Sequence, residues 1–171
     1  QNPAGLSSRN VAKVMIYSMI YGAGDERLGK VVGGGRREGR NLRERFFAKM
    51  PAIQLLQEKA KSKTVLKALD GRLLPVRSQH SALNLLLQSA GAIIMKEATV
   101  IMHRIFAEHK IYGVKQLAHV HDEVQFECPR EVGDRVGELA VRAIQETADV
   151  FGFRCPLHGE SRVGSSWYDT H

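Results

Sequence analysis

The stretch SRNVAKVMIYSMIYGAG, residues 8–24, decides how the rest of the chain is interpreted. It places two cations, Arg9 and Lys13, and two aromatic side chains, Tyr17 and Tyr21, at intervals of four residues. Residues at this spacing share one face of an α-helix, so a helix from about Arg9 to Tyr21 carries them as a stripe. Cations bind phosphate oxygens and an aromatic ring stacks on a base, which favours a nucleoside triphosphate. Spacing alone also fits a solvated cationic edge on a core helix.

A second stretch, LAHVHDEVQFEC at residues 117–128, has alternating apolar residues on both sides of an acidic tripeptide. This alternation predicts a strand on each side, with His121-Asp122-Glu123 at the tip of the hairpin. Carboxylates on a rigid tip project outward, where a hard divalent cation and substrate phosphates reach them. An ordinary polar hairpin turn fits the same residues.

Two further features lie between these stretches. The sequence TVLKALDGRLLPVRS contains Asp70-Gly71, a dipeptide typical of two-residue hairpin turns. A long helical pattern over 79–110 then carries Asn84 and Gln88 on one face, among leucines. Two such amides suit a DNA minor groove, where base acceptors lie in nearly the same place for every pair. A buried pair of amides bonded to each other is the alternative.

The remaining patterns are mostly helical. We expect helices over 36–50, 52–63 and 130–150, and a C-terminal tail with Trp167 and Tyr168 that supplies a strand or loop near the acidic hairpin. The predicted fold class is therefore α+β, with a helical region followed by an antiparallel sheet covered by helices.

Composition limits the class of protein. The chain has 171 residues and 43% hydrophobic content, enough for a folded core. Its formal net charge of +7 and its pI near 9.6 favour a polyanionic partner. Cys128 and Cys155 are far apart and form no CxxC pair, so we expect two buried thiols in a reducing compartment, with neither a zinc site nor a disulfide.

No segment is expected to span a membrane, because a span needs roughly 18 to 20 apolar residues. The best candidate, 82–95, is shorter and contains Asn84 and Gln88. The N-terminal sequence QNPAGLSSRN has no apolar signal-peptide core. The expected location is cytoplasmic.

Taken together, the motifs resemble family A DNA polymerases, the group of bacterial DNA polymerase I. The cationic-aromatic helix is similar to the fingers-helix motif of that family, and the acidic tripeptide is similar to its palm motif. LDGRLLPVRSQHSALNLLLQSAGAIIMK, residues 69–96, resembles the segment with its template–primer-binding Asn and Gln. The phrases YGAGDERLGKVVG and LNLLLQSAGA, and the stretch 153–171, are most similar to replicative polymerases of T-odd phages. The resemblance covers essentially the whole chain.

The resemblance implies the C-terminal part of a right-hand polymerase fold, with a mostly helical fingers subdomain over 1–66 and a palm subdomain over 67–171. It implies a DNA-directed DNA polymerase that catalyses template-directed nucleotidyl transfer in (phage) DNA replication. The implied cofactor is Mg²⁺, as two ions, and the implied partners are template–primer DNA and a dNTP. No membrane partner is implied.

The family motifs also imply roles for individual residues. In the hairpin, Asp122 is the metal-bridging carboxylate, Glu123 supports the catalytic site, and His121 lies against the primer terminus. In the helix, Arg9 and Lys13 hold the triphosphate, and Lys13 is also placed to protonate the leaving pyrophosphate.

The other implied roles concern the base and the DNA. Tyr17 stacks near the incoming sugar and base. The implied DNA-binding residues, apart from His121, are Tyr21, Gly22, Asn84 and Gln88, of which Tyr21 and Gly22 shape the pocket for the templating base.

One part of the family pattern has no counterpart. These polymerases have a second metal-binding Asp before the fingers helix, and residues 1–24 contain no acid. We therefore expect one carboxylate ligand to come from outside this chain, from an N-terminal polymerase portion or a partner chain. The first residue is Gln1 rather than Met, which fits either a polymerase divided into two chains or a trimmed fragment.

Two other functions fit the same residues. The first is a non-catalytic DNA-binding module that retains the polymerase fold, in which case function is insensitive to Asp122. The second is RNA synthesis, as in the single-subunit phage relatives, which share the Arg, Lys and Tyr helix. Tyr17 does not settle the choice of sugar.

Overall fold

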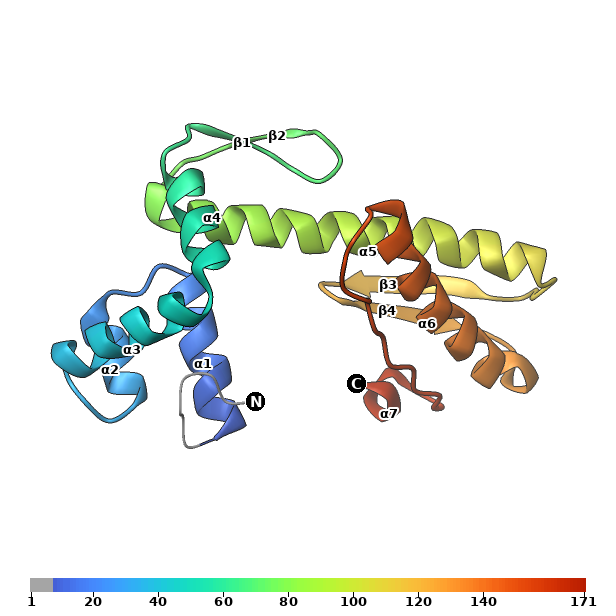
Figure 1. The fold of residues 1–171 in the computed structure, drawn as a ribbon. Helices are drawn as coiled ribbons and strands as arrows, with labels where there is room; N and C mark the ends of the chain where they lie inside the picture. Colours follow the sequence, from blue (N-terminus) through green and yellow to red (C-terminus); the bar gives the residue numbers. More distant parts are fainter. Residues whose placement is uncertain (1–7) are drawn as a thin grey trace. The chain divides into compact units, whose positions relative to one another are not determined.

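The computed structural model describes residues 8–171, which form two compact units (Figure 1). The first unit ends at Gln88, and the second is Ser89–His171. Both units combine helices with one two-stranded antiparallel sheet, which confirms the predicted α+β class. The predicted boundary between fingers and palm, at 66/67, is a boundary between polymerase subdomains, and the division into compact units does not test it. It stays a prediction.

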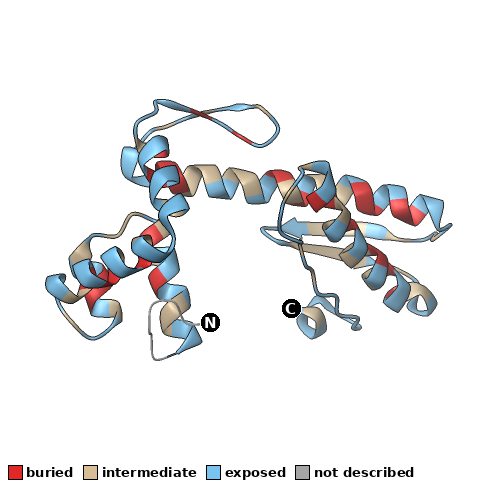
Figure 2. Ribbon diagram, in the orientation of Figure 1, coloured by how far each residue is buried: buried red, intermediate tan, exposed pale blue. Residues whose placement is uncertain are grey.

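Four helices form most of the first unit. They are α1 (Arg9–Ile20), α2 (Asp25–Val31), α3 (Arg36–Lys49) and α4 (Pro51–Lys61). Apolar residues at helical spacing turn inward from α1, α2 and α3 and form one core, drawn in red in Figure 2: Met15, Met19, Leu28, Leu42 and Phe46. Gly39 lets α3 approach the backbone of α2 closely, because a Cβ at this position would overlap the Asp25 carbonyl.

Helix α1 ends where the sequence predicts, and Gly22 is the reason. Gly22 has a φ of +77°, and its N–H donates to the Met19 carbonyl while the Ala23 N–H donates to the Ser18 carbonyl. This is the Schellman arrangement, in which a residue with positive φ follows the helix. A Cβ on Gly22 would also lie 2.8 Å from the His80 carbonyl oxygen. Glycine at this position is therefore required both for the turn and for the packing of the chain against residue 80.

The first sheet pairs β1 (Val65–Lys67) with β2 (Leu73–Pro75). Because Lys67 pairs with Leu73, the strands are joined by the five-residue loop 68–72, and the predicted two-residue turn at Asp70-Gly71 is wrong. The wider loop is closed by the Ala68 N–H, which donates to the Arg72 carbonyl at 2.9 Å. The side chain of Arg72 also donates to Asp70, so the loop supplies its own stabilising contacts.

A 3-10 turn, Gln79–Ser81, leads into the long helix α5 (Ala82–Glu108). Its residues up to 88 belong to the first unit, where Ala82 packs with Ala60 and Leu66. The rest of α5 belongs to the second unit.

The second unit has a core made by two helices and a sheet. Its elements are β3 (Lys115–Val120), β4 (Glu123–Glu127), a 3-10 turn (Arg130–Val132) and α6 (Gly133–Val150), together with the second part of α5. Buried residues of α5 and α6 contact one another, and Phe126 of β4 packs against them. The core consists of Ala98, Ile101, Met102, Ile105, Phe106, Val136, Leu139 and Ala143. The amphipathic helix predicted over 130–150 is confirmed, with its first turn in 3-10 form.

One helical stretch, Gln79–Glu108, is long and apolar enough to cross a membrane by length and composition. The expectation that no segment of the chain is long enough is wrong by this measure. The core of the second unit accounts for part of this apolar character, because Ala98, Met102 and Ile105 of α5 are buried against α6.

The C-terminal tail differs from the sequence prediction in two respects. It forms a short helix, α7 (Trp167–Thr170), where a strand or loop is expected. Cys155 is exposed, so the expectation of two buried thiols is wrong for this residue. Cys128 is partly buried, and burial raises the pKa of its thiol.

Candidate functional site

Helix α1 presents the cationic-aromatic stripe on its exposed side. Arg9, Lys13 and Tyr17 are exposed, as is Tyr21 directly after the helix, whereas Met15 on the other side is buried. The Lys13 Nζ lies 5.9 Å from the centre of the Tyr17 ring, and the Tyr17 and Tyr21 rings are 6.4 Å apart. The ammonium group and both rings are therefore neighbours that a single ligand can contact.

The start of the stripe is electropositive. Ser8 caps the helix by accepting a hydrogen bond from the Val11 N–H, and the first turn of α1 contains no acidic residue. Within residues 8–171, neither Arg9 nor Lys13 forms an ion pair. Both cations, and the positive end of the helix dipole, thus remain available to an anion.

Gln88, one of the residues predicted to bind DNA, lies at the end of this stripe. The Gln88 amide donates to the Tyr21 hydroxyl at 3.3 Å, so these two side chains are in contact. Gln88 is exposed and Asn84 is partly buried. The described residues contain no hydrogen bond between Asn84 and Gln88, so the alternative of a buried, mutually bonded amide pair is wrong.

The acidic tripeptide lies at the end of the β3–β4 hairpin. Val120 pairs with Glu123, so His121 and Asp122 form a two-residue turn and Glu123 is the first residue of β4. His121 has a φ of +56°. A positive φ at the first turn residue usually selects glycine, so a histidine here is held in an unfavourable conformation.

Asp122 and Glu123 have different surroundings. Asp122 is exposed and forms no hydrogen bond or ion pair within residues 8–171. The Glu123 carboxylate instead accepts from Gln125 Nε2 at 2.5 Å and from Trp167 Nε1 at 2.8 Å, and His171 Nδ1 lies 2.9 Å from its other oxygen. The Gln125 hydrogen bond, followed by that of His171, lowers the pKa of Glu123. The Asp122 carboxylate is therefore available to an external ligand, whereas the Glu123 carboxylate is bound by side chains of its own chain.

The carboxylates of the hairpin can be compared with the ligands that Mg²⁺ prefers. Mg²⁺ in proteins usually takes one or two carboxylates, with waters and substrate phosphates completing the shell. Asp122 fits this role because both of its oxygens are free of partners within residues 8–171. Within the same residues, no three side chains of His, Cys, Asp or Glu are grouped so that they could hold a metal ion. Asp122 alone does not fill a Mg²⁺ shell, so the remaining ligands of a bound ion would be other oxygen atoms, such as those of water or substrate phosphates.

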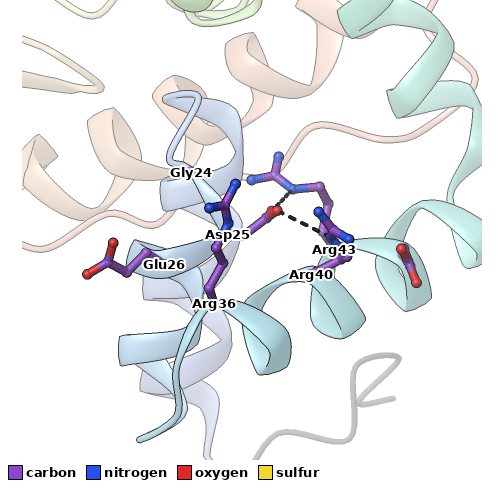
Figure 3. Close-up of a pocket in the computed structure, with 7 residues that line it drawn as sticks. Gly24, Asp25, Glu26, Arg36, Arg40 and Arg43 are labelled. Carbon is purple, nitrogen blue, oxygen red and sulfur yellow. Dashed lines mark hydrogen bonds and ion pairs between the residues drawn. The ribbon is translucent and has the colours of Figure 1, made fainter.

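An arginine-lined hollow of about 570 Å³ lies between α2 and α3 (Figure 3). Arg43 donates to Asp25 at 2.7 Å and also to the Ala23 carbonyl, and Arg40 lies 3.9 Å from Asp25. These two arginines therefore join α3 to α2, a role in packing that their pattern in the sequence does not indicate.

The contacts of Glu123 with the tail are also absent from the sequence prediction. The sequence places the tail near the acidic hairpin, and this is confirmed, but it names no partner for Glu123. The chain contains a single tryptophan, and its position 44 residues after Glu123 leaves no periodic signal of the contact.

Comparisons with known proteins match the whole chain. The family model described as DNA polymerase family A matches residues 4–169. The DNA-directed DNA polymerases of Enterobacteria phage T3 and Escherichia phage T7 are 35% and 36% identical to the chain, over all of it and 28% of each relative. DNA polymerase I of Geobacillus stearothermophilus is 29% identical, over 94% of the chain and 20% of the relative.

A solved structure shares the fold. It is described as the POL domain of Pol1 from M. smegmatis in complex with DNA primer-template and dNTP, and it matches with a TM-score of 0.69 and 19% identity. The match covers 87% of this chain and 28% of that one. This chain thus spans little more than a quarter of the length of the phage relatives it matches. The family model extends over nearly every residue, including the stripe and the acidic hairpin, and the chain belongs to DNA polymerase family A.

Proposed function

We propose that the chain is the fingers-and-palm part of a DNA-directed DNA polymerase, which adds dNTPs to template–primer DNA with two Mg²⁺ ions. The observation that carries this proposal is the state of Asp122. In a chain of DNA polymerase family A, it is a carboxylate at a hairpin tip with no partner within residues 8–171. A hard cation with bound phosphate oxygens is the ligand that suits such a group.

The proposed chemistry begins with the dNTP bound along α1. Arg9 and Lys13 bind its phosphates, because both are exposed cations without ion pairs within residues 8–171. Tyr17 would contact the sugar and base, and Lys13 would protonate the departing pyrophosphate. The closeness of the Lys13 ammonium to the Tyr17 ring supports one ligand that spans both.

On the hairpin, Asp122 would ligate Mg²⁺, and His121 would contact the primer terminus. Bound Mg²⁺ supplies activation of the primer hydroxyl and neutralises charge that develops on the phosphates. The exposed amide of Gln88, its neighbour Tyr21 and the partly buried Asn84 would contact the template–primer, where Tyr21 and Gly22 border the templating base.

The chain would act together with an N-terminal polymerase portion, in the same polypeptide or in a partner chain, that donates a second carboxylate. Two observations support this proposal. The chain spans 28% of its phage relatives, and no group of three metal-ligating side chains exists within residues 8–171. Such a polymerase would replicate DNA in the cytoplasm, which is the host cytoplasm if the protein is from a phage.

Reconstitution tests the function. The 171-residue chain, an N-terminal polymerase portion and their mixture are assayed for primer extension with Mg²⁺ and dNTPs, and extension is expected in the mixture alone. Asp122→Ala should lower the rate about 10³-fold or more, because loss of a metal ligand removes several kcal/mol of transition-state stabilisation. Asp134→Ala, which removes an exposed acid of α6, is the matched control and should retain the rate.

The outcomes separate the alternatives. Extension by the isolated chain would contradict the need for a second portion. Unchanged extension by the Asp122→Ala mixture would contradict the catalytic assignment. If the mixture binds template–primer DNA but never extends it, the chain is a non-catalytic binding module. Comparison of dNTP with NTP incorporation then distinguishes DNA from RNA synthesis.

A further inference from the structure

The side chain of Glu123 is held by several hydrogen-bond partners, and the proposed catalytic roles do not account for them. The Glu123 side chain is 29% exposed to solvent, yet both of its carboxylate oxygens have partners. Oε1 accepts from Trp167 and Gln125, and Oε2 contacts His171. A carboxylate with this many donors is held in one orientation, since charge-assisted hydrogen bonds are short and strong.

Helix α7, which carries Trp167, is itself fixed in position. Asp169 Oδ2 accepts from the backbone N–H and the hydroxyl of both Ser165 and Ser166, which closes the turn before α7. These hydrogen bonds, those of Ser165 first, lower the pKa of Asp169. Thr170 Oγ1 also lies 3.3 Å from Gln125 Oε1, which joins α7 to β4 by a second contact.

Burial does not explain the position of the indole. Trp167 is 50% exposed, and its neighbour Tyr168 is 92% exposed, so α7 adds little to the core. The specific contacts of Trp167 are the hydrogen bond from Nε1 to Glu123 at 2.8 Å and a near-perpendicular packing against the His171 ring, with ring centres 6.4 Å apart. Indole has a single donor and no acceptor, which makes it suitable for holding an anion.

We propose that Trp167 is a positioning residue, whose indole N–H fixes Glu123 and through it the strained His121-Asp122 turn that presents the metal-binding carboxylate. This inference rests on the proposed polymerase function. Glu123 directly follows Asp122, so the orientation of the first residue of β4 limits that of the turn. Glu123 thereby acts as an anchor held by its own chain, and Asp122, which has no partner within residues 8–171, stays free to bind Mg²⁺.

The first test does not depend on activity. The chain has one tryptophan, so its indole N–H gives one NMR resonance. In the wild-type chain, this proton should show the downfield shift and slow solvent exchange of a hydrogen bond to a carboxylate. Glu123→Ala should move it upfield and speed its exchange, whereas Glu127→Ala, at the other end of β4, should leave it unchanged. If Glu123→Ala leaves the chemical shift and the exchange rate of the indole proton unchanged, the proposal is overturned.

The second test measures the consequence for catalysis in the reconstituted enzyme. Trp167→Phe keeps an aromatic ring but removes the donor, and we expect kcat to fall by about 10- to 100-fold, as for other groups that orient metal ligands. The Mg²⁺ concentration for half-maximal activity should rise, while the affinity for template–primer DNA and the KM for dNTP stay nearly constant. Tyr168→Phe, next in sequence, is the control and should retain wild-type kinetics.

A double-mutant cycle decides whether Trp167 acts through Glu123. In a Glu123→Ala background, Trp167→Phe should cause little further loss, because the acceptor of the indole N–H is already absent. Equal losses in both backgrounds, or an unchanged kcat and Mg²⁺ dependence in Trp167→Phe, overturn the proposal. A wild-type mixture that cannot extend primers instead contradicts the polymerase function itself, and the NMR measurement then tests the anchor separately.

Discussion

The β1–β2 and β3–β4 hairpins both carry an aspartate and a residue with positive φ in their connections. In the first hairpin, the positive φ belongs to Gly71 and Asp70 is bound by Arg72 at 2.7 Å. In the second, the positive φ belongs to His121, and Asp122 has no partner within residues 8–171. The first connection has glycine at its positive φ and an ion-paired aspartate, and both features stabilise a loop. The second connection has neither feature.

This difference separates a hairpin that is stabilised by its own contacts from one that leaves its carboxylate free, and it supports the proposed role of the second hairpin. A loop that neutralises its own carboxylate and places glycine at its positive φ gains stability and offers little to a ligand. A turn with a strained histidine and a free carboxylate loses stability locally, and such strain is found where a site requires it. Motif likeness and local geometry thus support the same proposal independently.

Exchange of each aspartate for asparagine should have opposite effects in the two hairpins, and this is the largest effect that we predict. Asp122→Asn should lower primer extension by the reconstituted polymerase about 10³-fold with little change in melting temperature. Asp70→Asn should keep extension near the wild-type rate and slightly lower the melting temperature, because it removes the ionised partner of Arg72. Comparable rate losses in the two variants would remove the distinction between the hairpins.

Exchange of the residues with positive φ gives an effect of intermediate size. His121→Gly should stabilise the chain by roughly 1 kcal/mol, because glycine adopts positive φ without the steric cost, although it loses more entropy on folding. Primer extension should fall at the same time, since the imidazole is lost. Gly71→Ala should destabilise by a similar amount and leave the catalytic rate unchanged.

Lys110 provides a matched control for the strain. It has a φ of +54° at the C-terminal end of α5, where its N–H donates to the Ala107 carbonyl in an ordinary helix termination. Lys110→Gly should therefore stabilise the chain by about as much as His121→Gly, roughly 1 kcal/mol, without loss of extension. A denaturant titration of each variant measures the free energy of unfolding, and a destabilised His121→Gly variant would show that the turn is not strained.

Much of this fold is predictable from the sequence because its signals are local. Periodicity and the glycine at position 22 predict α1 to within one residue, and alternation predicts the β3–β4 hairpin with its acidic end. The exposed stripe of α1 follows from a spacing of four residues. These predictions depend on neighbours within one or two turns of the chain, for which the sequence contains the required information.

What the sequence misses depends on contacts between distant residues or on competition between turns. Asp70-Gly71 predicts a two-residue turn, but the contact between Ala68 and Arg72 selects a longer loop. Two partners of Glu123 lie 44 and 48 residues away, in and directly after α7, a helix of four residues with almost no periodic signal. Tertiary contacts of this kind are invisible to propensity and spacing.

The smallest predicted effect concerns the pH response of the first hairpin. The hydrogen bond from Arg72 lowers the pKa of Asp70 below its ordinary value of 3.8. A lowered pKa in the folded state means that the contribution to stability is present above the unfolded-state pKa and is lost as pH falls through the folded-state pKa. Since the pair is exposed, the loss should be small, and hydrogen exchange of the Ala68 amide, measured between about pH 5 and pH 2, should detect it before any global unfolding. In Arg72→Ala, the Asp70 titration should move up towards the ordinary value, and an unmoved midpoint would show that Arg72 is not the cause.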